Sequence, residues 1–83
     1  MTTYEQFKWF YKNYWGYESE YYIQQFAKVI NTNHTVAPNY GTAGNRIIDR
    51  FGTDGIIEFK KKWFDFCVLF NLSINVDLKE NTK

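Results

Sequence analysis

The chain has 83 residues, 18 of them aromatic, and its ten lysines and arginines nearly balance nine aspartates and glutamates. A formal net charge of +1 does not fit a protein that wraps nucleic acid through many phosphates, because such proteins carry a markedly basic face. A single cysteine, Cys67, excludes an internal disulfide, and no apolar run approaches the ~18 residues of a membrane span. We therefore expect one small cytoplasmic domain, residues 1–83, without a membrane segment.

The first predicted helix begins after Thr3, which forms a capping-box pattern with Gln6. Its aromatic residues recur every three or four positions, as expected for one face of a helix: Tyr4, Phe7, Phe10, Tyr11, Tyr14 and Trp15. Gly16 then either ends this helix or is tolerated inside a longer one. A second helix is predicted from about Ser19 to Ile30.

The polar turn after Ile30 leads into residues 35–41, an irregular connection that contains the only proline. Thr42 to Phe51 is predicted to be a short helix, and Gly52 stands where a left-handed cap is expected. Another helix follows, capped by Thr53 or Asp54 and running to about Phe70. Its apolar stripe consists of Ile56, Phe59, Trp63, Phe66, Cys67 and Phe70.

From Leu72 to Leu78 apolar and polar residues alternate strictly, which is the period of a β-strand. A lone strand is not stable, so this one requires a partner. The extended residues 35–38, a second copy of the chain in a homodimer, or the sheet edge of a target are the alternatives. Residues 79–83 are expected to fray. The predicted fold is mainly α, a compact bundle of about four helices with a short C-terminal strand, and a small α+β arrangement remains open.

Residues that would carry catalysis or bind a metal are sparse. His34 is the only histidine and lies in a polar turn, and Cys67 lies in an apolar stripe. One histidine and one cysteine cannot fill a tetrahedral metal site, and the chain has no glycine-rich phosphate loop. We therefore predict a protein that is not an enzyme and has no metal or cofactor.

The helix pair at 43–63 resembles a helix-turn-helix, but aligning Gly52 with the turn places Glu58 and Lys61 at positions that are normally apolar. A simple corner of two packed helices is the alternative. Basic residues nevertheless recur along this pair and are candidate contacts to a partner or to phosphate: Arg46, Arg50, Lys60, Lys61 and Lys62.

Three aromatic residues are not explained by the predicted core. At 100° per residue, Trp9 points away from the aromatic face of the first helix, and Tyr21 points away from the apolar face of the second. Tyr17 joins Tyr21 if the second helix starts early. Such residues are either scattered surface aromatics or anchors of a binding patch, since Trp and Tyr are enriched in interface hot spots.

The stretch from Asn39 to Phe66, NYGTAGNRIIDRFGTDGIIEFKKKWFDF, resembles a helical element of small bacteriophage accessory proteins. In that element an apolar pair, a charged pair, a Phe-Gly or Tyr-Gly turn and an aromatic-rich helix follow one another. The Asn-, Lys-, Tyr- and Phe-rich composition is similar to that of phage proteins from low-GC bacteria, among them anti-CRISPR inhibitors. The resemblance implies a compact, non-enzymatic protein that binds a host machine inside the bacterial cell.

The leading hypothesis is therefore a phage-type interaction protein that inhibits or modulates a host nucleic-acid machine, such as a CRISPR–Cas effector. Its expected contacts are the three aromatic anchors and the five basic residues named above, with at most a weak contact to nucleic acid. The alternative is a small DNA-binding or replication-accessory protein that uses the 43–63 helix pair. A self-assembling component that pairs through residues 72–78 is a third hypothesis.

Overall fold

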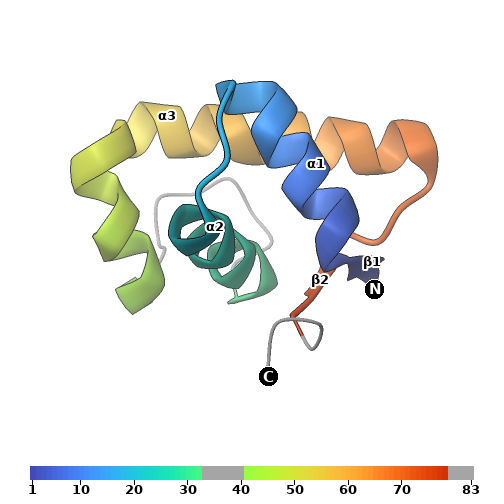
Figure 1. Ribbon diagram of the computed structural model, residues 1–83, viewed down its shortest axis with the longest axis horizontal. Helices are drawn as coiled ribbons and strands as arrows, with labels where there is room; N and C mark the ends of the chain where they lie inside the picture. Colours follow the sequence, from blue (N-terminus) through green and yellow to red (C-terminus); the bar gives the residue numbers. More distant parts are fainter. Residues whose placement is uncertain (33–40, 79–83) are drawn as a thin grey trace.

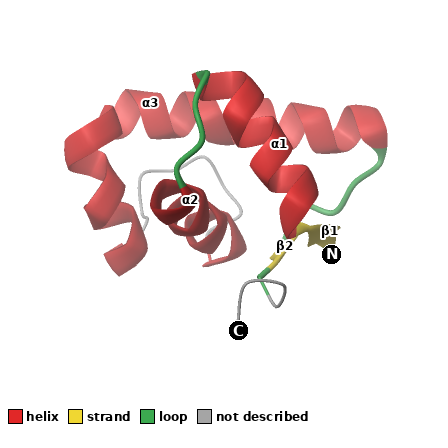
Figure 2. Ribbon diagram, in the orientation of Figure 1, coloured by secondary structure: helices red, strands yellow, loops and turns green. Residues whose placement is uncertain are grey.

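The computed structural model describes residues 1–32 and 41–78, with side chains from residue 47 onward in the second range. Its elements in chain order are β1 (Thr2–Thr3), α1 (Tyr4–Trp15), α2 (Glu20–Thr32), α3 (Gly41–Phe70) and β2 (Val76–Asp77). The fold is mainly helical with one short strand pair, as Figure 2 shows, which agrees with the predicted class. His34, residues 35–40 of the predicted connection at 35–41 and the predicted frayed tail at 79–83 lie outside the described residues, whereas Gly41 begins α3.

Both ends of α1 are fixed by the local signals found in the sequence. The Thr3 hydroxyl accepts a hydrogen bond from the Gln6 amide, and the Gln6 side chain accepts one from the Thr3 amide, both at 3.2 Å. At the other end Gly16 has a left-handed conformation, with φ 85°, and its amide donates to the Lys12 carbonyl. The capping box is thus confirmed, and Gly16 ends the helix rather than continuing it.

The third and fourth predicted helices form a single kinked element, so the expected number of helices is wrong by one. Gly52 alone leaves the helical conformation, with φ 79° and ψ 157°, and the chain resumes a helix directly after it. Figure 1 shows the result as a sharp bend that divides α3 into two arms. The signal for a positive φ at Gly52 was correct, and this one residue separates the two helical arms without a longer turn.

Replacing Gly52 with alanine is expected to lower the free energy of unfolding by about 1–3 kcal/mol, because only glycine adopts this combination of φ and ψ without strain. The added methyl group itself would meet open space. Gly55→Ala is the matched control. It lies in the helical part of α3 and its Cβ would make only ordinary contacts, so it should raise stability by about 0.5–1 kcal/mol. Urea unfolding of the two variants tests this, and equal effects would contradict it.

Helix α2 lies in the angle between the two arms of α3 (Figure 1). Phe26 of α2 contacts Phe51 before the bend, with ring centroids 5.0 Å apart, and Phe59 after it, at 4.6 Å. The bend at Gly52 therefore lets one helix pack against both arms, which buries the apolar face of α2.

Phe59 lies at the centre of the core and is fully buried. Its ring contacts aromatic rings from both α1 and α2, at centroid distances of 4.6–6.0 Å. These rings belong to Phe7, Phe10, Tyr11, Tyr14, Trp15 and Phe26. Apart from Trp9, the aromatic residues of α1 are thus buried in the core or packed against it, as their helical spacing predicts.

The predicted C-terminal strand is shorter than expected and pairs with a segment that the sequence did not indicate. β2 runs parallel to β1, with Thr2 opposite Val76 and Thr3 opposite Asp77. The Thr2 amide donates to the Asn75 carbonyl at 2.9 Å, and the Thr2 hydroxyl donates to the Ser73 carbonyl. The partner is therefore β1 from the same chain.

Asn31, at the end of α2, occupies the other side of β2. Its side-chain amide donates to the Val76 carbonyl at 2.8 Å, and its side-chain oxygen accepts from the Val76 amide at 2.7 Å. One side chain thus satisfies both backbone groups of a fully buried residue, much as a neighbouring strand would. Trp63 adds a further bond by donating from Nε1 to the Ile74 carbonyl at 3.0 Å.

Candidate functional site

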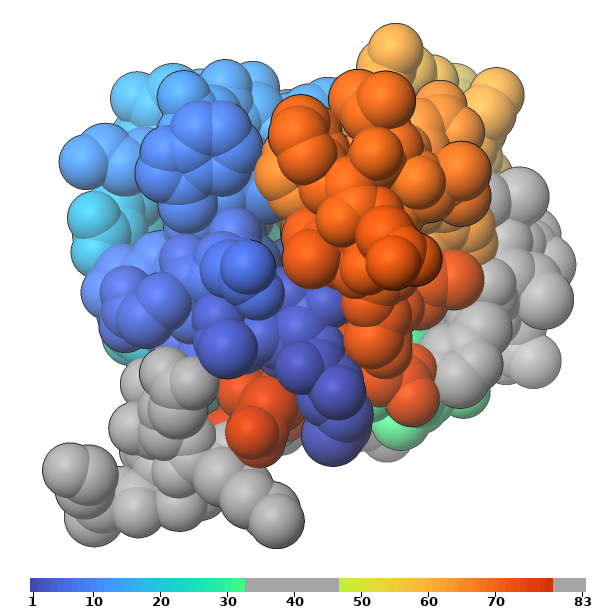
Figure 3. All heavy atoms as spheres, turned by 90° about the vertical axis from the view of Figure 1, so that its right-hand side faces the viewer, coloured from blue at the N-terminus to red at the C-terminus, as the bar shows by residue number. Residues whose placement is uncertain are grey.

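An open aromatic groove lies where α1 meets the last turns of α3. Phe10 of α1 packs on Phe66 of α3 with ring centroids 5.0 Å apart, and Trp9 lies beside the same ring at 6.0 Å. Figure 3 shows the side chains of α1, in blue, next to those of the C-terminal part of α3, in orange. The groove has a volume of about 490 Å³ and is lined by Glu5, Gln6, Trp9, Phe66, Phe70 and Leu72.

The end of α3 positions Leu72 in this groove. Asn71 takes a left-handed conformation with φ 57°, and the Leu72 amide then donates to the Cys67 carbonyl at 2.8 Å. This is the Schellman cap, in which the chain turns back over the last helical turn. The cap brings Leu72 against the same groove as Phe66 and Phe70.

The groove exposes aromatic side chains that the core does not enclose. Trp9 is 57% exposed and Phe70 is 58% exposed. Next to Phe70, the side chains of Val68 and Leu69 are also largely in solvent. Apolar patches of this kind on a small protein usually mark interaction sites. The lining contains one carboxylate, Glu5, and no nucleophile, so its chemistry suits binding of apolar groups.

The lysines of α1 point to another part of the surface. Lys8 lies 3.0 Å from Glu18 and 3.3 Å from Glu20, and Lys12 lies 4.0 Å from Glu18. Hydrogen bonds to these carboxylates raise the pKa of Lys8, and the hydroxyl of Tyr4, which donates to Glu20, lowers the pKa of Glu20. This cluster ties α1 to the start of α2 and leaves no lysine in the lining of the aromatic groove.

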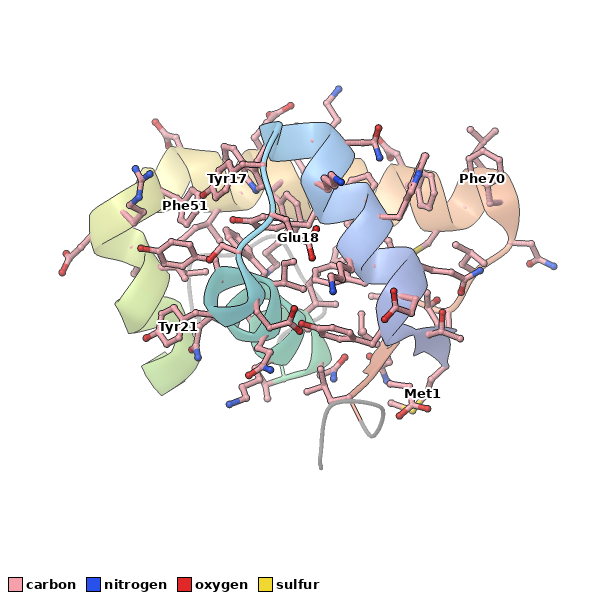
Figure 4. The ribbon with its side chains drawn as sticks, in the orientation of Figure 1. Met1, Tyr17, Glu18, Tyr21, Phe51 and Phe70 are labelled. Carbon is pink, nitrogen blue, oxygen red and sulfur yellow. The ribbon has the colours of Figure 1, made fainter. Side chains whose placement is uncertain are left out.

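The three predicted aromatic anchors do not form one surface. Trp9 is exposed as predicted and lines the aromatic groove. Tyr21 is also exposed, at 51%, but Figure 4 shows it on the side of the molecule opposite Phe70. Tyr17 is partly buried against the core, and its hydroxyl accepts a hydrogen bond from the Tyr11 hydroxyl at 3.0 Å. Of the three, Trp9 alone belongs to the groove.

The predicted basic contacts are also dispersed. Lys60 is 0% exposed, so its expected place at the surface is wrong, and burial lowers its pKa. Lys61 is exposed, whereas Lys62 lies 3.9 Å from Glu58. Arg50 lies over the ring of Phe51 at 5.7 Å. The side chain of Arg46 lies outside the described residues.

The helix pair at 43–63 has the geometry of a bent helix. Glu58 and Lys61, which a helix-turn-helix would hold inside, are exposed. Ile47, Ile56 and Phe59 are buried instead, as expected for the simple corner of two helices. Together with the buried Lys60, this arrangement forms no basic face among the side chains that the structure describes from residue 47 to residue 63.

The sequence missed most of the residues that line the aromatic groove. Phe70 was placed in the inward stripe of its helix because it lies one turn after Phe66, yet it is mainly exposed. Leu72 was placed in a strand, whereas it belongs to the cap of α3. The sequence signal was the run Val68, Leu69 and Phe70, three consecutive apolar residues that cannot all face one core.

Cys67 is buried, as its place in the apolar stripe predicts. Burial raises its pKa to about 11, and its thiol donates a weak hydrogen bond to the Ser73 carbonyl at 3.5 Å. A thiol in this state is a poor nucleophile at neutral pH. Within residues 1–32 and 41–78, no three His, Cys, Asp or Glu side chains are placed to hold a metal ion together.

None of the helices in the described ranges combines the length and apolar character needed to cross a membrane. Comparison with known proteins adds no assignment. No protein-family model matches the chain, and neither the curated proteins nor the solved structures contain a significant match. The aromatic groove is therefore the feature of the molecule from which a function can be inferred.

Proposed function

We propose that this protein is a non-enzymatic interaction protein that binds a partner protein through the aromatic groove. The observation that carries the proposal is the exposure of Trp9 and Phe70 in the lining of one apolar groove. Tryptophan in a partly enclosed apolar site is typical of interface hot spots. Keeping such side chains in water has no benefit for the fold, whereas a partner would bury them.

The resemblance to small phage accessory proteins gives this proposal a more specific form. In that form the partner is a host nucleic-acid machine, a protein or ribonucleoprotein such as a CRISPR–Cas effector, and binding inhibits or modulates it. The aromatic groove is the contact surface. Lys61 and Arg50, both exposed, are available as additional polar contacts.

Trp9→Ala and Phe70→Ala are expected to reduce partner binding by about tenfold or more each, as for truncated hot-spot residues, while the fold is retained. Tyr21→Ala is the matched control, since Tyr21 has a similar exposure outside the groove. The measurement is affinity capture from a bacterial lysate, with and without nuclease, followed by titration of the purified partner. Capture of the same proteins at the same level by all variants would contradict the proposal.

The alternative function, DNA binding through the 43–63 helix pair, has less support because Lys60 is buried and Lys62 lies beside Glu58. If it held, DNA affinity would fall steeply with salt, and the slope would decrease when Lys61 is removed. Pairing of residues 72–78 between copies is also less favoured, since β1 and Asn31 already bind the backbone of residues 75 and 76.

A further inference from the structure

The lining of the aromatic groove has a definite electrostatic character. Glu5 is its one charged residue, and it is exposed at the groove's edge. Glu18, Glu20 and Glu58 each lie within 4.0 Å of a lysine nitrogen. Glu5 has no such partner among the described residues, although it lies on the same helix as Lys8 and Lys12.

The end of α3 adds to this negative character. A helix C-terminus carries a partial negative charge, and basic side chains in the last turn usually offset it. The last turn of α3 contains no basic residue, and Phe70 in that turn lines the groove. A helix end without a basic side chain in its last turn and a carboxylate without a lysine or arginine partner among the described residues therefore border the same apolar surface.

We infer that the aromatic groove takes a segment of a partner protein that inserts an apolar side chain next to an arginine or lysine. This inference rests on the proposed function and specifies the chemistry of the partner. The apolar side chain would pack between Trp9 and Phe70. The cation would pair with Glu5 and approach the ring of Trp9, which is the aromatic side chain that attracts cations most strongly. A groove of about 490 Å³ lies within the size range of pockets that enclose a ligand of a few side chains.

The same charge pattern disfavours other occupants. The phosphates of nucleic acid and of anionic lipids would meet a carboxylate and no cation in the lining. A symmetric dimer across the groove would place two copies of Glu5 in one interface without a lysine from the lining to neutralise them. A protein segment with a basic and an apolar side chain complements both the apolar lining of the groove and the carboxylate of Glu5.

The test uses a random-peptide display library selected on the full chain, on Trp9→Ala and on Glu5→Lys. We expect the wild-type protein to enrich peptides with an arginine or lysine close to a large apolar residue, and Trp9→Ala to lose them. Replacing that arginine by citrulline, which is uncharged, should weaken a selected peptide about fivefold. Glu5→Lys should weaken it at least about tenfold, since like charges then meet.

A charge swap separates recognition from a structural role of Glu5 at the start of α1, where an acidic residue also favours the helix. The selected peptide with its arginine changed to glutamate should bind Glu5→Lys more tightly than it binds the wild-type protein. Loss of helix stability alone would not produce this reversal. Thermal unfolding of Glu5→Lys without peptide measures the structural part separately.

The outcomes distinguish this inference from the proposed function. Peptides that require Trp9 but show no excess of arginine or lysine, or a charge swap without reversal, would overturn the inference and leave the proposed function standing. If no selected peptide requires Trp9 for binding, the result contradicts both the inference and the proposed function. Stronger Trp9-dependent binding to single-stranded DNA or to anionic phosphatidylserine vesicles than to any peptide would overturn the inference. A dimer that sedimentation detects for the wild-type protein but not for Trp9→Ala would overturn it as well.

Discussion

Replacing Phe59 with alanine is expected to lower the free energy of unfolding by about 3–5 kcal/mol, which is most of the stability of a small domain. Phe59 is fully buried, and its ring is the shared contact of α1, α2 and the second arm of α3. No neighbouring side chain can close the cavity without leaving its own ring contacts. Urea unfolding followed by circular dichroism measures the loss.

Phe70→Ala is the matched control for this prediction. It removes the same atoms from the same helix, but Phe70 is mainly exposed, so the expected loss is below about 0.5 kcal/mol. The contrast also checks the assignment of the aromatic groove. If Phe70→Ala destabilised the protein as much as Phe59→Ala, Phe70 would be a core residue, and the groove would not be a free surface.

Replacing Asn31 with alanine is the second change with a large expected effect, a loss of about 2–4 kcal/mol. The variant leaves the amide and the carbonyl of Val76 without their partner, and each buried unsatisfied group costs about 1–3 kcal/mol. Urea unfolding gives the overall loss. Hydrogen exchange of the Val76 amide should become much faster in the variant, which would locate the loss of stability at β2.

Asn13→Ala provides the comparison for Asn31. The Asn13 side chain also donates to a backbone carbonyl, that of Trp9, at 2.8 Å, but this bond is exposed to solvent. Water replaces such a bond, so the loss should be near zero. A loss below about 0.5 kcal/mol for Asn31→Ala would mean that the double hydrogen bond to Val76 does not stabilise the strand pair.

The helices could be predicted from the sequence because their signals are local. The capping box of Thr3 and Gln6, the glycine at position 16 and the 3–4 residue spacing of apolar side chains lie within a few residues of the structure they specify. The strand partner could not be predicted in this way. Thr2–Thr3 is too short to show a strand period, and its pairing joins the two ends of the described chain.

The candidate site was predicted only in part, for a related reason. A helical wheel gives the direction of Trp9 relative to its own helix, and that direction was correct. It does not give the orientation of one helix relative to another. The sequence therefore could not show that Trp9 and Tyr21 lie on different surfaces of the molecule. Lys60 shares a face with Ile56 and Trp63, at spacings of four and three, and this signal for burial was present in the sequence.

The pairing of β1 with β2 has a consequence for the order in which the protein forms during synthesis. Thr2 bonds to Ser73, 71 residues later in the chain, whereas the contacts between α1 and α2 need no residue beyond Thr32. Thr2 and Thr3 are therefore among the last of the described residues to find their partners. Until Val76 has been synthesised and has left the ribosome, its part of the core stays uncovered. The side-chain amide of Asn31 is hydrogen-bonded to water until then.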